Sequence, residues 1–185
     1  MFKELLARTA RRLDRRGIPY MVIGGQAVLL YGEPRLTRDI DITLGISPER
    51  AGEVVALAEE LDLRILIGDP IDFARKTFVL PCSEEKSGIR VDFIFSQSPY
   101  EEQALRRARA VRIGDAEVRF ASLEDLIIHK VIAGRPRDLE DAERVLAKNP
   151  DWDRDYVFSW LGEFDRALQA DFTASLRELL KKGEA

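Results

Sequence analysis

Two aspartates separated by one residue, Asp39 and Asp41, open a segment in which polar and aliphatic side chains alternate as far as Leu44. Residues two apart on a β-strand share a face, so the two carboxylates are expected on the same side of a sheet. Adjacent carboxylates repel each other unless a cation lies between them. Mg²⁺, held by a few carboxylates and by substrate phosphates, suits this pattern better than a Ca²⁺ cage. The alternative interpretation is a solvated strand face.

A third aspartate, Asp92, lies in residues 89–95, which alternate in the same way. Its apolar neighbours predict a buried face, and Asp92 belongs to the opposite face. If this strand lies beside residues 39–44, the three carboxylates converge. Three converging acids are what a two-metal phosphoryl-transfer site requires, in which the ions activate an attacking hydroxyl and steady the leaving pyrophosphate.

A pair of glycines, Gly24 and Gly25, follows a predicted strand at residues 20–23 and precedes a predicted helix at 26–31. Such a junction offers free backbone N–H groups and the positive end of a helix dipole to an anion. Arg35, Thr37 and Arg38 lie just before the aspartates and could contact phosphates. A tight turn without a ligand is the alternative interpretation.

The ordered combination resembles the nucleotidyltransferase superfamily of DNA polymerase β. Members carry a glycine pair, a spacer, an Asp-x-Asp strand and a later lone acid; here the spacer between Gly25 and Asp39 is 13 residues long. The strings VIGGQA at 22–27 and RLTRDID at 35–41 look most like the AbiEii-type branch, the nucleotidyltransferase-like toxins of bacterial toxin–antitoxin pairs and their minimal relatives. The resemblance covers residues 18–45 and 120–146.

This resemblance implies a mixed β-sheet flanked by helices, an α/β (α+β) fold, and it implies roles for individual residues. Asp39, Asp41 and Asp92 would bind Mg²⁺ or Mn²⁺, and Asp92 would also be the base that takes the proton of the acceptor hydroxyl. Gly24 and Gly25 would hold the triphosphate. Lys130 would neutralise phosphate charge, and Asp138 would orient Lys130 or contact the nucleotide. The alternatives are that Lys130 extends to solvent from an apolar helix face and that Asp138 belongs to a solvated first helical turn.

The remaining pattern predicts the elements that position these residues. We expect an α/β core at 1–120 and a helical part at 121–185 packed on it. Further predicted elements are helices at 1–16, 47–61 and from 98, strands at 77–80, 111–113 and 117–120, loops near Gly68, Pro70 and 83–88, and helix interruptions at 134–136, at 149–150 and near Gly162.

Composition limits the function classes. The 185 residues carry a formal charge of −4, which excludes a uniformly basic nucleic-acid coat. One cysteine and one histidine exclude an intramolecular disulfide and leave too few soft ligands for a structural zinc site, so we expect a cytoplasmic protein. No segment has the roughly 20 apolar residues of a bilayer helix. The basic first 16 residues could be a targeting peptide, but their apolar stripe favours an amphipathic helix of the fold.

The sequence therefore predicts an enzyme that transfers a nucleoside monophosphate from an NTP to a hydroxyl on RNA or protein. The resemblance to the AbiEii-type branch adds the expectation of a toxin with an antitoxin partner. The densest basic segment that could face an acceptor such as tRNA contains Arg106, Arg107, Arg109 and Arg112. One alternative is a small-molecule modifier like the aminoglycoside nucleotidyltransferases, which the acidic net charge favours. The other is a non-catalytic nucleotide-binding module, although an idle site has no physical reason to keep a repulsive carboxylate cluster.

Overall fold

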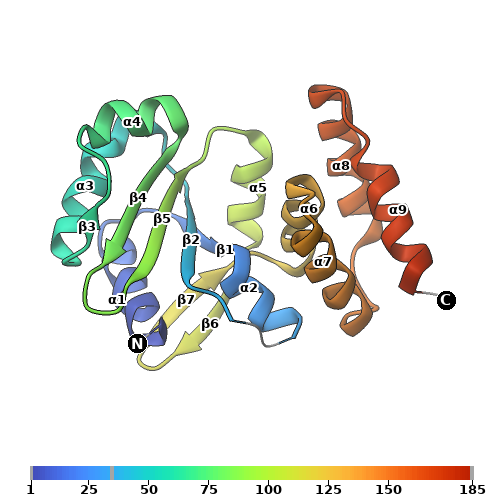
Figure 1. Ribbon diagram of the computed structural model, residues 1–185, viewed down its shortest axis with the longest axis horizontal. Helices are drawn as coiled ribbons and strands as arrows, with labels where there is room; N and C mark the ends of the chain where they lie inside the picture. Colours follow the sequence, from blue (N-terminus) through green and yellow to red (C-terminus); the bar gives the residue numbers. More distant parts are fainter. Residues whose placement is uncertain (1, 34–35, 184–185) are drawn as a thin grey trace. The chain divides into compact units, whose positions relative to one another are not determined.

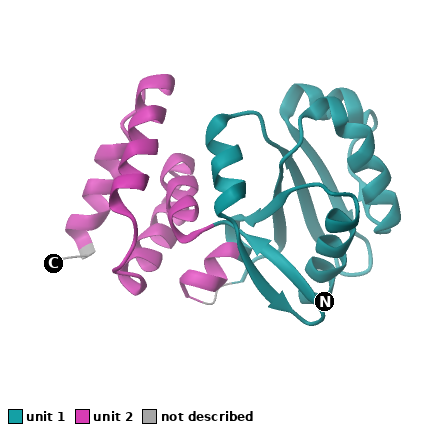
Figure 2. Ribbon diagram, turned by 180° about the vertical axis from the view of Figure 1, so that it is seen from behind, with its two compact units in different colours: residues 1–26, 36–121 teal, residues 27–35, 122–185 magenta. Residues whose placement is uncertain are grey.

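A computed structural model describes residues 2–33 and 36–183 of the chain, so the predicted phosphate contact Arg35 lies outside the described residues. The chain divides into two compact units, shown in different colours in Figure 2. Unit 1 comprises residues 1–26 and 36–121, and unit 2 comprises residues 27–35 and 122–185. No helix among the described residues is both long and apolar enough to cross a membrane.

Unit 1 is built on a seven-stranded sheet of order β3-β4-β5-β2-β1-β7-β6 (Figure 1). The pairs β2–β5 and β1–β7 are parallel and the other neighbours are antiparallel, which confirms the predicted mixed sheet. The strands are β1 (Tyr20–Ile23), β2 (Asp39–Leu44), β3 (Arg64–Ile65), β4 (Val79–Glu84), β5 (Ile89–Phe95), β6 (Arg109–Ile113) and β7 (Ala116–Phe120).

The helices of unit 1 begin where the sequence offers capping residues. Ser98 and Glu101 form the predicted capping box, in which each side chain accepts a hydrogen bond from the other residue's backbone N–H. The first helix buries Leu5, Leu6 and Leu13, as its apolar stripe predicts. These helices are α1 (Phe2–Arg15), η1 (Pro48–Arg50), α3 (Ala51–Glu60), α4 (Pro70–Thr77) and α5 (Pro99–Arg107).

Unit 2 is helical. Its helix α6 begins at the predicted N-cap Ser122, whose hydroxyl accepts a hydrogen bond from the backbone N–H of Asp125. It ends at Gly134, whose left-handed φ of 63° suits a residue without a side chain. The helix α2 (Gly24–Tyr31) starts in unit 1 and continues into unit 2. The helices that lie wholly in unit 2 are α6 (Leu123–Ala133), α7 (Pro136–Lys148), α8 (Arg154–Leu168) and α9 (Phe172–Gly183).

The segment before β4 differs from its prediction. Residues that the sequence predicts as a loop form α4, because Asp69 accepts a hydrogen bond from the backbone N–H of Asp72 and Pro70 is compatible with a first helical turn. This helix ends at Phe78, which has a left-handed φ of 60°. The strand predicted at 77–80 consequently begins at Val79, and it runs on to Glu84 into the predicted polar connection. The two-residue strand β3 was too short to predict.

Two helix boundaries also differ from their predictions. The interruption predicted near Gly162 is wrong, since α8 is continuous there and ends at Gln169, which adopts a left-handed φ of 52°. Burial of Val157 and Leu161 outweighs the modest helical cost of one glycine. At the glycine pair, α2 begins at Gly24 rather than at Gln26, so both glycines belong to its first turn.

Candidate active site

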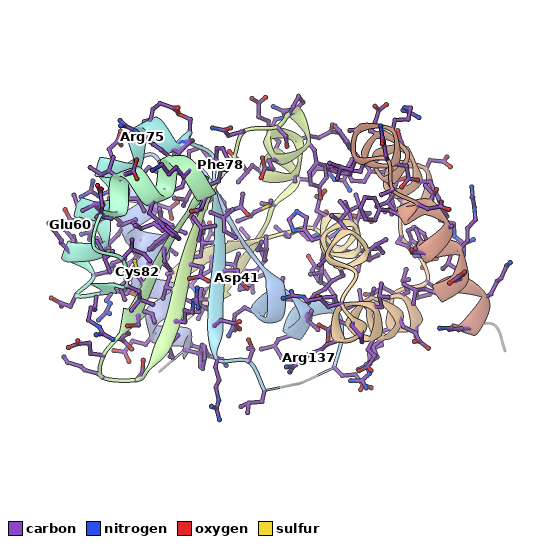
Figure 3. All side chains as sticks on the ribbon, turned by 45° about the horizontal axis from the view of Figure 1, so that its top comes forward. Asp41, Glu60, Arg75, Phe78, Cys82 and Arg137 are labelled. Atoms are coloured by element: carbon purple, nitrogen blue, oxygen red, sulfur yellow. The ribbon has the colours of Figure 1, made fainter. Side chains whose placement is uncertain are left out.

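The three predicted aspartates lie on neighbouring strands of unit 1. β2 and β5 run parallel, with Asp41 opposite Asp92 and Asp39 opposite Arg90 in the register. Because alternate residues share a sheet face, these four side chains belong to the same face. Figure 3 labels Asp41 on β2. Asp39 is exposed, and Asp41 and Asp92 are half-buried, so the carboxylates remain accessible from solvent.

Apolar residues on the opposite face fix this register. Ile40 and Ile42 of β2 and Val91 and Phe93 of β5 are at most 1% exposed. A slip of one residue would exchange the faces and drive the carboxylates into the core. Burial of each such side chain contributes about 1.5–3 kcal/mol, so packing on one face holds the acids next to one another on the other.

Gly24 lies directly against Asp41. Ile23, the residue before Gly24, is the register partner of Asp41. A Cβ atom built on Gly24 would lie only 2.2 Å from Oδ2 of Asp41, and the φ of Gly24 is +62°. Both the space and the backbone conformation therefore require glycine. The first turn of α2, with backbone N–H groups that have no partner within the helix, consequently begins beside a carboxylate.

Thr37 holds Asp39. The Thr37 hydroxyl is 2.6 Å from Oδ1 of Asp39, to which it donates a hydrogen bond, and Thr37 is buried. Arg38, between them, is exposed and its carbonyl accepts a hydrogen bond from the backbone N–H of Arg90. Thr37 thus orients an aspartate in this structure, whereas the phosphate contacts predicted for Thr37 and Arg38 stay predictions.

Arg90 is a member of the site that the sequence analysis missed. Its Nε donates a hydrogen bond of 2.8 Å to Oδ1 of Asp92. This bond, together with the charges of Asp92, Asp41 and Asp39, raises the pKa of the guanidinium above its usual range. Arg90 precedes Asp92 by two residues in the alternating strand, so the same periodicity that selected Asp92 would have placed Arg90 on its face.

The donor set suits a hard divalent cation. Three carboxylates supply only oxygen ligands, which Mg²⁺ prefers, and Arg90 already brings a cation to Asp92. Among residues 2–33 and 36–183, however, no three acidic, histidine or cysteine side chains are gathered closely enough to form a metal cluster. Asp39 is held by Thr37 and Asp92 by Arg90, so a metal ion would have to draw these side chains together. The metal role of the three aspartates stays a prediction.

In unit 2, the other predicted site residues form a buried ion cluster. Nζ of Lys130 on α6 lies 2.6 Å from Oδ1 of Asp138 and 2.9 Å from Oδ2 of Asp141, both on α7. The three side chains are between 4% and 7% exposed, so Lys130 does not extend to solvent and Asp138 is not a solvated residue. Asp138 thus contacts Lys130, and its predicted role of orienting Lys130 for catalysis stays a prediction. The action of Lys130 on phosphate stays a prediction.

The pKa of Asp138 reflects this cluster. Burial alone would raise the pKa of the carboxyl, but hydrogen bonds from Lys130 and Arg135 outweigh burial and hold the pKa below its usual range. A folded pKa below the unfolded one stabilises the native state at a pH above the unfolded value of 3.8. That contribution is lost as the pH falls from there toward the folded pKa.

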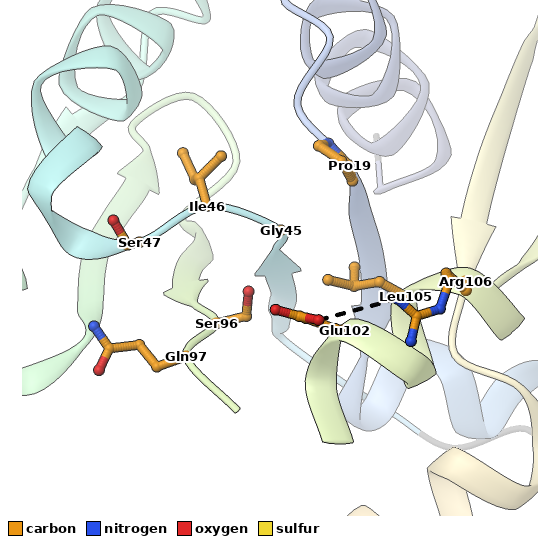
Figure 4. Close-up of a pocket in the computed structure, with 9 residues that line it drawn as sticks. All are labelled: Pro19, Gly45, Ile46, Ser47, Ser96, Gln97, Glu102, Leu105 and Arg106. Atoms are coloured by element: carbon orange, nitrogen blue, oxygen red, sulfur yellow. Dashed lines mark ion pairs between the residues drawn. The ribbon is translucent and has the colours of Figure 1, made fainter. Parts of the chain in front are cut away.

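A separate pocket of about 630 Å³ lies at the other end of the same strands (Figure 4). It opens beyond the last residues of β2 and β5 and before the first residue of β1, so it contains none of the predicted aspartates or glycines. Its lining residues are Pro19, Gly45, Ile46, Ser47, Ser96, Gln97, Glu102, Leu105 and Arg106. Glu102 and Arg106 form a loose ion pair on its α5 side, at 4.0 Å.

Residues 2–156 match a family described as nucleotidyltransferases of unknown function, DUF6036. The chain belongs to this family. The match spans both segments of the resemblance noted in the sequence, so this nucleotidyltransferase is an enzyme of the predicted class. The narrower AbiEii-type assignment stays a prediction. No curated protein is similar to this nucleotidyltransferase in sequence.

Solved structures share the fold of the nucleotidyltransferase. ANT(2")-Ia in complex with adenylyl-2"-tobramycin is 20% identical, with a TM-score of 0.59 over 91% of this chain and 98% of that one. An antigenic nucleotidyltransferase-like protein from Paracoccidioides brasiliensis is 15% identical, with a TM-score of 0.57 over 95% and 91%. The lincosamide antibiotic adenylyltransferase LnuA, bound to lincomycin, is 17% identical, with a TM-score of 0.51 over 72% and 89%. At these identities the similarity confirms the nucleotidyltransferase-like fold.

Replacing Gly24 by alanine should abolish nucleotidyl transfer, because the added methyl group would displace the Asp41 carboxylate. Gly17→Ala is a matched control, since Gly17 has the same φ of +62° but no atom within 4 Å of an added Cβ. Both variants should lose about 1–2 kcal/mol of unfolding free energy through backbone strain. Transfer rates and urea unfolding should be measured for both. Equal activity of the two variants would contradict the assigned contact.

Replacing Lys130 by methionine should lower the free energy of unfolding by about 3–5 kcal/mol, because Asp138 and Asp141 would remain buried without their shared cation. Lys148→Met on the same helix pair is the control: Lys148 is 48% exposed and lies 3.8 Å from Glu33, so its loss should change stability by less than about 0.5 kcal/mol. Urea unfolding measures both. A loss below about 1 kcal/mol at Lys130 would show that the cluster is not a stabilising element.

Proposed function

We propose that the protein is a Mg²⁺-dependent nucleotidyltransferase that moves a nucleoside monophosphate from an NTP to a hydroxyl acceptor. The observation that supports this proposal is the register of β2 and β5, which sets Asp41 opposite Asp92. Gly24 and the start of α2 adjoin the same carboxylates. Acid side chains beside a helix N-terminus suit a substrate that brings both a metal ion and phosphates.

Each carboxylate has a distinct part in this proposal. Asp39 and Asp41 hold the metal from one strand, and Asp92 holds it from the next. When bound, the divalent metal activates the acceptor hydroxyl and neutralises the leaving pyrophosphate. Asp92 accepts the hydroxyl proton as the acceptor oxygen bonds to the α-phosphorus and the bond to pyrophosphate breaks. Asp92 suits the role of base because it is half-buried yet still accessible.

The first turn of α2, which contains Gly24 and Gly25 and is called the glycine turn below, positions the nucleotide. Backbone N–H groups of Gly24 and Gly25 donate to the triphosphate, and the absence of side chains lets the phosphates approach the backbone. Thr37 keeps the Asp39 carboxylate in place through its 2.6 Å hydrogen bond. The exposed Arg38 adds a positive charge near the phosphates.

The acceptor is a hydroxyl on RNA, such as tRNA, or on a protein, and a toxin role would add an antitoxin partner. A small-molecule acceptor is the second candidate. It is favoured by the similarity in fold and length to ANT(2")-Ia, whose structure contains adenylyl-2"-tobramycin. The chain covers 98% of that protein's chain, so the two are built on the same extent of fold.

Label transfer tests the function and the acceptor class together. Purified protein is incubated with Mg²⁺, each α-labelled NTP and a cell extract, and the extract is then separated into RNA, protein and small-molecule fractions. We expect label in one fraction, and we expect Asp41→Asn to lower its rate at least about 100- to 1,000-fold by removing a charge that binds the metal. Urea unfolding should show that the variant remains folded.

Asp115→Asn provides the matched control, because Asp115 is a hairpin aspartate whose side chain is 80% exposed. This variant should retain the full transfer rate. Label that persists in Asp41→Asn would contradict the proposed site. Metal-dependent NTP binding without label in any fraction would instead support a non-catalytic nucleotide-binding module.

A further inference from the structure

Arg90 pairs with Asp92, the third carboxylate of the predicted metal site. Its Nε lies 2.8 Å from Oδ1 of Asp92, and the Asp92 side chain is only 17% exposed. In the register, Arg90 stands opposite Asp39 while Asp92 stands opposite Asp41. The Arg90 guanidinium therefore contacts Asp92 and also feels the charges of Asp41 and Asp39. Its positive charge offsets part of the repulsion between the three carboxylates.

The Arg90 side chain also has space beside it into which its guanidinium can rotate. The Arg90 side chain is 55% exposed, so it is not locked in the core. It lines a hollow of about 540 Å³ on unit 1, together with Arg64, Ser83 and two glutamates, Glu84 and Glu85, which pair with Arg8 and Arg64. Ser83 is the register partner of both Arg64 and Arg90, which places the three residues in one row across β3, β4 and β5. A long, flexible side chain at this position can exchange one set of partners for another.

A metal ion bound by Asp92 would lie next to the Arg90 guanidinium. A divalent ion bound through Asp92 would lie within a few ångströms of the guanidinium, where two positive charges repel. Ligation through Oδ1 would also place the metal and the Arg90 Nε on the same oxygen, which weakens the hydrogen bond that the guanidinium donates. Rotation of Arg90 away from Asp92 would relieve this repulsion and leave both carboxylate oxygens of Asp92 to the metal.

We propose that Arg90 is a built-in counter-ion of the carboxylate site, which holds Asp92 in the metal-free protein and is displaced by the incoming metal. This inference rests on the proposed metal-dependent function. Arg90 thereby sets the metal concentration at which the site fills, and it acts as a positioning residue for Asp92. The released guanidinium is then available, from the row that it shares with Arg64, to an anionic group of the substrates.

Mn²⁺ binding to the nucleotide-free protein tests the proposal without any turnover. Free Mn²⁺ is followed by its electron paramagnetic resonance signal during titration of wild-type protein, Arg90→Gln and Arg64→Gln. Arg90→Gln should bind Mn²⁺ about tenfold more tightly, the effect of removing one competing charge-assisted hydrogen bond. Arg64 is the matched control, since it is 63% exposed and pairs with Glu85 outside the carboxylate cluster. Its replacement should change the affinity less than twofold.

A second pair of variants separates the Asp92 contact from a general loss of positive charge. In an Asp92→Asn background, adding Arg90→Gln should no longer tighten Mn²⁺ binding, because the group that Arg90 holds has lost its charge. Thermal unfolding confirms that each variant is folded. The Mg²⁺ concentration that gives half-maximal transfer should fall in Arg90→Gln by the same factor as the Mn²⁺ dissociation constant.

The outcomes distinguish the inference from the function on which it rests. Equal or weaker Mn²⁺ binding by Arg90→Gln, or the same gain in Arg64→Gln, overturns the role of Arg90 and leaves the metal site intact. A gain that persists in the Asp92→Asn background overturns it as well. Absence of Mn²⁺ binding in the wild type and in every variant overturns the proposed metal site itself.

Discussion

The structure depends on one electrostatic constraint: sheet register holds the carboxylates of two parallel strands side by side. Apolar packing on the far face of β2 and β5 imposes this arrangement, since Ile42 and Phe93 are buried behind Asp41 and Asp92. Like charges at such spacing destabilise the fold unless something positive compensates them. The chain thus uses core packing to maintain an arrangement that charge repulsion alone would disperse, which is typical of sites that bind cations.

The surroundings of the carboxylates follow from this constraint. Thr37 donates to Asp39 and Arg90 pairs with Asp92, so these two acids each have a stabilising neighbour, and Gly24 leaves room for the carboxylate of Asp41. These local partners explain how unit 1 tolerates the charges without a tight metal cluster. A divalent ion would neutralise the charges of the three carboxylates together. The backbone of Gly24 and Gly25 would hold the phosphates that also bind this ion.

Period-two alternation was enough to predict the faces of β2 and β5 from the sequence, because burial alternates along all of β5 and along β2 as far as Ile42. The pairing of β2 with β5 is a tertiary contact that no local sequence pattern predicts, and only the family resemblance implied it. Arg90 was missed as a site residue because no local pattern shows that its guanidinium pairs with Asp92. α4 was missed because Asp69 and Pro70 favour loops and helix starts alike. Neither local pattern nor propensity revealed that Asp141 shares Lys130 with Asp138, since that pairing forms only when α6 and α7 pack.

The central claim is that these carboxylates and the glycine turn together hold a metal-bound NTP. Its most direct test is an anomalous diffraction map from crystals grown with Mn²⁺ and a non-hydrolysable α,β-methylene NTP. The account predicts a manganese peak among the carboxylates of Asp39, Asp41 and Asp92, with the triphosphate against the backbone of Gly24 and Gly25. A manganese peak away from the three aspartates, or a triphosphate bound elsewhere on the protein, would contradict it.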